Sequence, residues 1–256
     1  MVNRTVLFEV RGHIAYVTLN RPQHGNAIDS CMADELCRIW QGITDNEDIR
    51  VAILTGAGAS FCSGQETGEM QPVEAALQAR GSEDCFDALA ELNRPVIAAI
   101  NGDAISAGLE LALCCDVRIA AEGARFGLPE VAQGTIPGHG GTQRLPRIVG
   151  KAKALELVLL GETIDTREAQ RICLVNKVVA PDELLPTAEA LARRIASLAP
   201  IAERYAKEAV NKGADLTLEQ GLRLEGDLTV LLQTTDDRTE GVAAFLGKRT
   251  PNFKGR

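Results

Sequence analysis

Short apolar segments alternate with helix-like segments over most of the chain, and this alternation limits the fold more than any other feature. Largely apolar runs lie at VAILT (51–55), VIAAI (96–100), VRIAA (117–121) and residues 175–179. Runs of this length predict strands that are buried on both faces of a sheet. Helical periodicity marks three further segments, at residues 141–149, 151–160 and 166–171. The pattern predicts an α/β fold in which parallel strands are joined by helical crossovers.

The start of the chain predicts a hairpin followed by a helix. Residues 5–10 and 13–19 are β-prone and are separated by an Arg-Gly pair, as in a tight antiparallel turn. A Pro- and Gly-containing break, LNRPQHGNAI, leads to Asp29 or Ser30, and either residue fits a helix N-cap. We expect this helix to end near Thr44.

Two segments between the apolar runs differ in character. GAGASFCSGQETGEM (56–70) is too rich in Gly and Ser for a regular element, and predicts a loop just past the end of a strand. Residues 71–92 are polar and Ala-rich, and predict a helix.

The last quarter of the chain predicts helices and no strand. They are expected at residues 184–198, 201–211, 218–232 and 240–246. This helical region is too short for a large core of its own, so it must pack on the preceding part or on another subunit. We therefore expect a core that carries the active site at residues 1–195, and a C-terminal region for oligomerisation and active-site cover at 196–256.

Charge and cysteine usage exclude several functional classes. The formal net charge of −8 argues against general binding to nucleic acid or anionic membranes, because both need a basic face. Seven cysteines without CxxC spacing and three scattered histidines predict buried thiols in a reducing compartment, and no metal site. The N-terminus lacks a basic, apolar leader, and no stretch reaches membrane-spanning length. We expect a cytoplasmic protein.

The stretch at residues 101–144 places a carboxylate where chains usually avoid one. Glu110 lies in an otherwise apolar run, and in a helix no cation would lie one turn away from it. An unpaired buried carboxylate costs roughly several kcal/mol or takes up a proton, so a chain that keeps one is expected to use it. A second carboxylate, Glu130, follows Pro129. Its local sequence fits equally a reactive group or a helix N-terminal residue that favours the helix dipole.

Two glycine-containing segments can supply donors to a negative oxygen. In FCSGQ (61–65), Gly64 lets the chain turn so that backbone N–H groups face a cavity. In SAG (106–108), the unpaired N–H groups at a helix start favour an anion. Donors from two such loops form an oxyanion hole. Gly-rich loops after strands are more often simple turns, so each segment alone is weak support.

Other reactive groups in these segments carry less weight. His139 lies among glycines, but the chain has no GxSxG nucleophile elbow, which argues against a hydrolase triad. Cys62 is expected to be a packing residue, because no nearby cation in the sequence would activate its thiol. No nucleotide-binding loop is expected either, because GTIPGHGGTQR (134–144) lacks the lysine of a P-loop and NGDAISAG (101–108) lacks the fingerprint spacing of a dinucleotide-binding turn.

These residues resemble the crotonase superfamily over nearly the whole chain, and within it the enoyl-CoA hydratases. The motifs are LNRPQHGNAI (19–28), FCSGQETGEM (61–70), RPVIAAINGDAISAGLELALCCDVRIA (94–120), FGLPEVAQGTIPGHGGTQRLPRIVG (126–150) and the C-terminal TTDDRTEGVAAFLGKRTPNFKGR. The resemblance implies a crotonase-like spiral of ββα units, with a C-terminal helical region that builds a trimer or a dimer of trimers. It also implies an acyl-CoA thioester substrate, with no metal and no cofactor beyond the coenzyme A of that thioester.

The resemblance assigns roles to individual residues. It implies an oxyanion hole made by the backbone N–H groups of Gln65 and Ala107, where Ala107 replaces a glycine common in the family. Glu110 and Glu130 match both catalytic glutamates of enoyl-CoA hydratases. By analogy Glu110 activates the water and Glu130 protonates the α-carbon, although the sequence leaves the reverse assignment open. Substrate and CoA contacts are expected from Arg21, Asn26, Ala27, Ser63, Gly64, Glu66, Thr67, Gly108, Pro129, Gly138 and Lys254.

The same fold hosts several reactions, so alternatives stay open. We predict hydration of a 2-enoyl-CoA to a 3-hydroxyacyl-CoA, as in fatty-acid β-oxidation, although intermediates of aromatic-ring and amino-acid degradation fit equally well. An enoyl-CoA or dienoyl-CoA isomerase that relies on Glu130 is the second possibility. A non-catalytic acyl-CoA or RNA binder is the third, and the acidic helix expected at residues 29–48 argues against RNA. The loop after Gln65 lacks the lysine that many relatives carry for CoA phosphates.

Overall fold

A six-stranded sheet forms the centre of the molecule. In this computed structural model, residues 4–66 and 84–256 are described. The strands follow the order β1 (Val6–Arg11), β2 (Ile14–Leu19), β3 (Val51–Gly56), β5 (Val96–Ile100), β7 (Val117–Ala121) and β10 (Lys177–Val179). β1 and β2 pair antiparallel, and all the other neighbours pair parallel. The predicted hairpin and the α/β class are confirmed.

A smaller four-stranded sheet carries the loops of the site. Its order is β4 (Ser60–Cys62), β6 (Asp103–Ile105), β8 (Arg125–Gly127) and β9 (Ile164–Asp165). Each of β4, β6 and β8 follows directly after a strand of the large sheet, so the chain repeats a strand-strand-helix unit. The prediction of loop throughout residues 56–70 is wrong at β4. Pairing with β6 gives these three residues hydrogen-bond partners, which outweighs their weak strand propensity.

Helices cover both faces of the large sheet. α1 (Ser30–Asp45) packs on one face and α8 (Leu184–Ala196) on the other. The other described helices before the C-terminal region are α3 (Cys85–Ala90), α4 (Ala107–Cys114), α5 (Gly141–Val149), α6 (Lys151–Leu160) and α7 (Thr166–Arg171). Short 3-10 helices lie at η1 (Pro22–His24), η2 (Glu130–Gln133) and η3 (Pro181–Glu183). The Asp29 side chain caps α1 by accepting from the Met32 N–H at 2.8 Å, as expected.

The alternation of side chains along the strands separates two hydrophobic layers. Leu54 and Val17 pack in the layer that contains Trp40 of α1. Val51 and Ile53 pack in the second layer, which contains Ala188 of α8. A residue-by-residue alternation of this kind is the pleat of a strand whose two faces are both covered.

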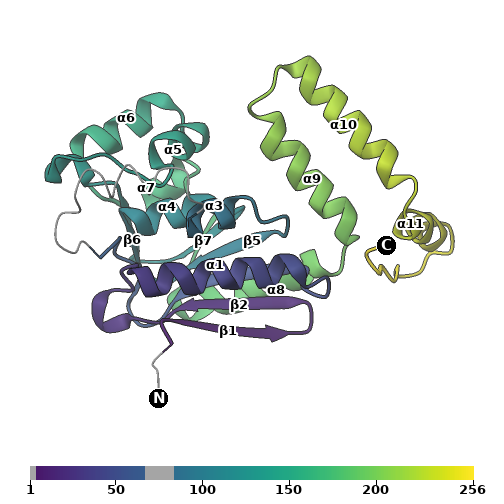
Figure 1. Ribbon diagram of the computed structural model, residues 1–256, viewed down its shortest axis with the longest axis horizontal. Helices are drawn as coiled ribbons and strands as arrows, with labels where there is room; N and C mark the ends of the chain where they lie inside the picture. The colour runs from purple at the N-terminus through teal and green to yellow at the C-terminus, as the bar shows by residue number, and fades with distance from the viewer. Residues whose placement is uncertain (1–3, 67–83) are drawn as a thin grey trace.

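The C-terminal helices extend away from the sheet. α9 (Pro200–Gly213) and α10 (Leu218–Leu232) form a helical hairpin, and α11 (Asp236–Leu246) follows it near the chain end (Figure 1). Several polar contacts tie this region to the core. Lys207 pairs with Asp116 at 2.7 Å, and the Arg50 guanidinium donates to the Phe253 carbonyl at 3.0 Å.

Several predicted boundaries are wrong. α11 begins four residues before the predicted start at residue 240, because Thr235 caps the helix and two aspartates complement the dipole in its first turn. β10 begins at Lys177 rather than at residue 175, because the N–H of Val175 binds the Ala169 carbonyl instead of the sheet. Of the helix predicted at 71–92, the described part is α3, and residues 71–83 lie outside the described residues. Within the described chain, no helix is long and apolar enough to cross a membrane.

Candidate active site

Glu110 is carried into the interior by a helix that is buried on every side. All eight residues of α4 are buried, and Glu110 is 1% exposed. Its Oε1 accepts hydrogen bonds from the backbone N–H of Gly141 at 2.7 Å and of His139 at 2.8 Å. The expectation of an unpaired carboxylate is therefore wrong, because α5 turns the unpaired N–H groups at its start toward this oxygen.

Burial dominates the protonation of Glu110. Removal from water raises its pKa above the ordinary glutamate value, and the two backbone hydrogen bonds and nearby His139 oppose this shift. The charge of Glu130 adds to the increase in the pKa of Glu110. No described residue donates a hydrogen bond to the second oxygen of Glu110, Oε2.

Glu130 is a buried carboxylate without a hydrogen-bond partner in the described structure. It is the first residue of η2, directly after Pro129, and is 8% exposed. Neither of its side-chain oxygens has a partner among the described residues. A buried polar atom of this kind is costly unless it serves a ligand or the chemistry of a site. The structure thus buries both of the glutamates that the sequence singled out.

The backbone N–H of Gln65 is turned away from its neighbouring segment. Ile28 donates to the Gly64 carbonyl and accepts from the Glu66 N–H, both at 2.9 Å. In a parallel bridge of this form, the residue between those two partners directs its own N–H to the opposite side. Among the described residues, the Gln65 N–H makes no backbone hydrogen bond.

The N–H of Ala107 also has no hydrogen-bond partner among the described residues, for a different reason. Ala107 is the first residue of α4, so its N–H has no partner within the helix. The preceding Ser106 adopts φ 56° and ψ −131°, a conformation uncommon outside glycine, which turns the chain sharply from β6 into α4.

Glycines bring the two N–H-bearing segments against each other. A Cβ at Gly108 would lie 2.1 Å from the carbonyl oxygen of Cys62, and one at Gly64 would lie 3.1 Å from the Ser106 Cβ. The close approach is possible only without these side chains. Gln65 and Ala107 therefore belong to two loops in direct contact.

The loop around residues 21–29 joins this cluster through polar contacts. Arg21 donates to the Ala27 carbonyl and to the Glu66 carboxylate, both at 2.7 Å. Asn26 is fully buried, and its amide donates to the Ala57 and Ser60 carbonyls. These bonds give Asn26 a structural task, because they hold the loop against β4.

The remaining expected contacts are spread more widely. Ser63 is exposed and donates to the His24 carbonyl at 3.4 Å, and Gly138 has open space where a Cβ would lie. Lys254 follows Phe253, whose carbonyl accepts a hydrogen bond from Arg50. Arg50 directly precedes β3, whereas the glycine loop comes after the other end of that strand. The structure does not bring Lys254 to the other residues within one chain. Thr67 lies outside the described residues.

Sequence reasoning missed the contacts of the His139 ring. Its Nδ1 lies 3.0 Å from Oδ2 of Asp84, and its Nε2 lies 3.3 Å from Oε1 of Gln65. The ring stacks on Phe86 with centroids 4.1 Å apart. Asp84 carries a local signal only as the N-cap of α3, and its second partner depends on tertiary structure.

Cys62 is a packing residue, as expected. It is fully buried beneath the glycine loop, and burial raises the pKa of its thiol to about 12. A thiol with such a pKa is protonated near neutral pH and is a poor nucleophile.

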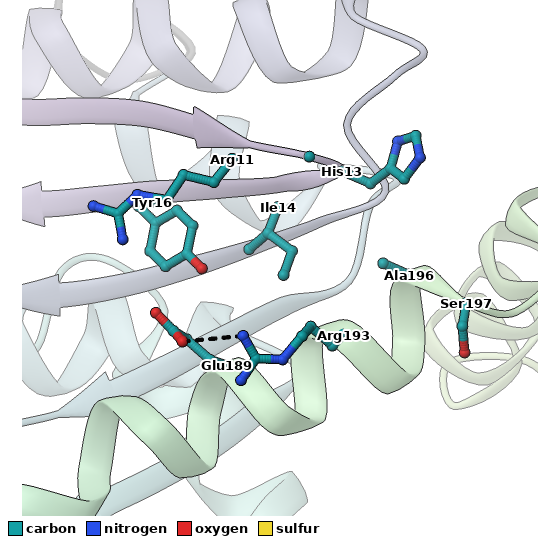
Figure 2. Close-up of a pocket in the computed structure, with 9 residues that line it drawn as sticks. Arg11, His13, Ile14, Tyr16, Glu189, Arg193, Ala196 and Ser197 are labelled. Atoms are coloured by element: carbon teal, nitrogen blue, oxygen red, sulfur yellow. Dashed lines mark hydrogen bonds and ion pairs between the residues drawn. The ribbon is translucent and has the colours of Figure 1, made fainter.

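A separate hollow of about 480 Å³ lies between the β1–β2 hairpin and α8 (Figure 2). It contains none of the predicted site residues. Its charged groups are paired locally, Arg193 with Glu189 at 3.2 Å and Arg11 with Glu9 at 2.6 Å. The buried carboxylates therefore mark a chemically distinct site elsewhere.

The structure thus combines an α/β fold with two buried carboxylates, Glu110 and Glu130. The chain matches the model of the enoyl-CoA hydratase/isomerase family over residues 9–256, and it belongs to that family, the crotonases.

Relatives of known name support this assignment along the whole chain. (E)-Benzylidenesuccinyl-CoA hydratase of Thauera aromatica is 43% identical over 253 residues, covering 98% of this chain and 99% of the relative. 2,3-Dehydroadipyl-CoA hydratase of Escherichia coli (strain K12) is 42% identical over 244 residues, covering 95% and 96%. The crystal structure of enoyl-CoA hydratase from Bacillus anthracis superimposes with a TM-score of 0.92 at 40% identity, covering 98% and 100%.

Proposed function

We propose that this protein hydrates a 2-enoyl-CoA to the 3-hydroxyacyl-CoA. The observation that carries the proposal is the burial of two carboxylates whose charges influence each other, Glu110 and Glu130. Two contacting loops supply N–H groups, of Gln65 and Ala107, that have no backbone partner among the described residues. Members of one fold family differ in reaction, so this constellation and not the fold supports hydration.

The two N–H groups would polarise the thioester. Hydrogen bonds from Gln65 and Ala107 to the carbonyl oxygen withdraw electrons from the conjugated double bond, so the β-carbon becomes electrophilic. They also stabilise the enolate oxygen that forms when water adds. Backbone donors fixed by a strand bridge and a helix start need no reorganisation during the reaction.

The carboxylates would divide the acid and base tasks. The Gly141 and His139 N–H groups fix one oxygen of Glu110, and leave Oε2 to hold a water and accept its proton. Glu130, without a partner in the described structure, would deliver a proton to the α-carbon. Water thus adds as OH at the β-carbon and H at the α-carbon. Two neighbouring carboxylates suit this exchange, because one holds a proton while the other is ionised.

We also propose self-association through the C-terminal region at residues 196–256, as a trimer or a dimer of trimers. Large apolar side chains are exposed on α10 and α11, among them Leu218 at 79% and Phe245 at 82%. A group of large exposed apolar side chains on neighbouring elements is typical of an interface. Lys254 would then meet CoA from a neighbouring subunit.

The test is turnover in H₂¹⁸O against short, long, branched and cyclic 2-enoyl-CoAs. A hydratase gives a 3-hydroxyacyl-CoA that carries one ¹⁸O, and both Glu110→Gln and Glu130→Gln lose most of the activity. A shifted double bond without ¹⁸O would instead establish an isomerase. In that case Glu130→Gln would be the more damaging change.

A further inference from the structure

We propose that His139 is a positioning residue that holds the Gln65 loop and the Glu110 carboxylate in one fixed arrangement. The inference rests on the proposed function, because it assigns a purpose to contacts at both halves of that site. His139 reaches the two halves through different atoms, its ring on one side and its backbone on the other.

The ring connects α3 to the glycine loop. Nδ1 lies 3.0 Å from Asp84 Oδ2, and Nε2 lies 3.3 Å from Gln65 Oε1, so the imidazole bridges two residues that are 19 positions apart in sequence. Stacking on Phe86, with 14° between the ring planes, limits rotation of the imidazole. The ring thereby holds the side chain of Gln65, the same residue whose backbone N–H is assigned to the oxyanion hole.

The backbone of the same residue holds the other half of the site. The His139 N–H donates to Glu110 Oε1 at 2.8 Å, and its carbonyl accepts from the Arg144 guanidinium at 2.7 Å. A displacement of His139 would therefore move both the N–H that donates to Glu110 and the ring that contacts the Gln65 side chain. Groups that orient a reacting residue in this way commonly change activity by about 10- to 100-fold when removed.

Asp84 sets which ring nitrogen carries the proton. A carboxylate oxygen only accepts, so Nδ1 must be the donor in this contact. Nε2 of the neutral ring then accepts a hydrogen bond from the NH₂ group of the Gln65 side chain. Nε2 of the cationic ring would instead donate to the amide oxygen of Gln65. A flip of the amide exchanges its NH₂ group and its oxygen, so either contact can form. The charged groups that face this histidine are Asp84 from the start of α3, Glu110 from α4 and Arg144 from α5.

A double-mutant cycle tests the tether. We expect His139→Ala to lower kcat roughly 10-fold with KM changed less than about 2-fold, since the peptide N–H on Glu110 remains. Gln65→Ala also keeps its backbone N–H, so it should give a similar loss. If the ring acts through Gln65, the double variant loses no more than either single variant. Independent, multiplicative losses, or full activity of His139→Ala, would overturn the inference.

Two further variants separate positioning from general stability. His139→Asn keeps a donor near the place of Nδ1 but cannot reach Gln65, so it should lose activity like His139→Ala while retaining the wild-type melting temperature. His139→Gln, which can present an amide near the place of Nε2, should recover part of the lost kcat. A loss of kcat that simply follows the melting temperature across the variants would contradict a positioning role.

The proton position gives a readout that does not depend on turnover. The chain has three histidines, so ¹⁵N-histidine NMR resolves His139 once His139→Gln identifies its signals. We expect the neutral ring to carry its proton on Nδ1, and Asp84→Asn to move it to Nε2. An active wild type with the proton on Nε2 would overturn this inference. An Nδ1–H ring in a protein that hydrates no enoyl-CoA would instead overturn the proposed function and leave the contact standing.

Discussion

Oε1 of Glu110 lies 2.7 Å from the backbone nitrogen of Gly141, across 31 residues of sequence. A Cβ on Gly141 would lie 2.9 Å from that same oxygen and equally close to Pro137. A glycine at this position therefore lets the start of α5 approach the buried carboxylate closely enough to donate to it.

Gly141→Ala should displace the carboxylate without unfolding the protein. The added methyl group must move either Glu110 or the start of α5, and a shift of about 1 Å at a reacting group can cost roughly 100-fold in rate. We expect kcat to fall by roughly that factor in steady-state assays. Gly42→Ala, in α1 with open space at the Cβ, is the control and should keep wild-type kcat. An unchanged kcat in Gly141→Ala would show that the position of Glu110 is not critical.

Gly108→Ala should disrupt the contact between the two donor loops. Its Cβ would meet the backbone oxygen of Cys62 at 2.1 Å, and backbone cannot move as a flexible side chain can. Overpacking of this kind typically costs about 1–3 kcal/mol. Urea unfolding should show that loss together with a fall in kcat, while Gly226→Ala, with open space on α10, loses neither. Wild-type stability with full activity in Gly108→Ala would contradict the close packing of these loops.

Local sequence signals predicted many elements because their ends are fixed locally. Gly140 and Gly150 delimit α5, and the Thr217–Gln220 capping box starts α10, so both boundaries match the sequence prediction. β4 was missed because its order comes from pairing with β6, forty positions later. Glu110 was found because a charged residue in an apolar helix is a local anomaly.

The hydrogen-bond partners of the site residues could not be predicted from the sequence, because they are distant along the chain. The hydrogen bonds from His139 and Gly141 to Glu110 span 29 and 31 residues, and His139 reaches Asp84 across 55. Local propensity contains no information on such contacts. Physical reasoning from the sequence therefore singled out Glu110 but not the groups that hold it.

The raised pKa of Glu110 should make activity and stability respond oppositely to pH. In the window between 4.5 and its higher folded value, the native state holds a proton that the unfolded state has lost, so stability falls as pH rises. Hydration needs the ionised base, so kcat should rise over the same window. Glu110→Gln should lose activity, yet its melting temperature relative to wild type should increase with pH. A constant difference in melting temperature from pH 4 to 9 would contradict this assignment.

Glu203 should give a second pH effect, unrelated to catalysis. Burial raises its pKa to about 7, against the opposing charge of Arg50, and its buried Oε2 has no partner among the described residues. The stability that Glu203 contributes should fall as pH rises from about 4.5 through 7, and Glu203→Gln should remove this part of the loss but not the part due to Glu110. Glu168 is the control, because its ion pairs lower its pKa to about 2. Glu168→Gln should therefore differ from wild type by a constant amount between pH 5 and 8 in thermal melts.

The exposed apolar side chains of the C-terminal helices should be buried by self-association. Phe245 and Leu218 are about four-fifths exposed in the single chain, at 82% and 79%. A lysine placed in an interface would be desolvated without a partner, which is unfavourable by several kcal/mol in rough terms. We expect wild type to sediment as a trimer or a dimer of trimers, and Leu218→Lys with Phe245→Lys to sediment as a smaller species. Leu7→Lys, on exposed β1, should keep the wild-type mass. A monomeric wild type, or a double variant of unchanged mass, would show that these side chains do not form the interface.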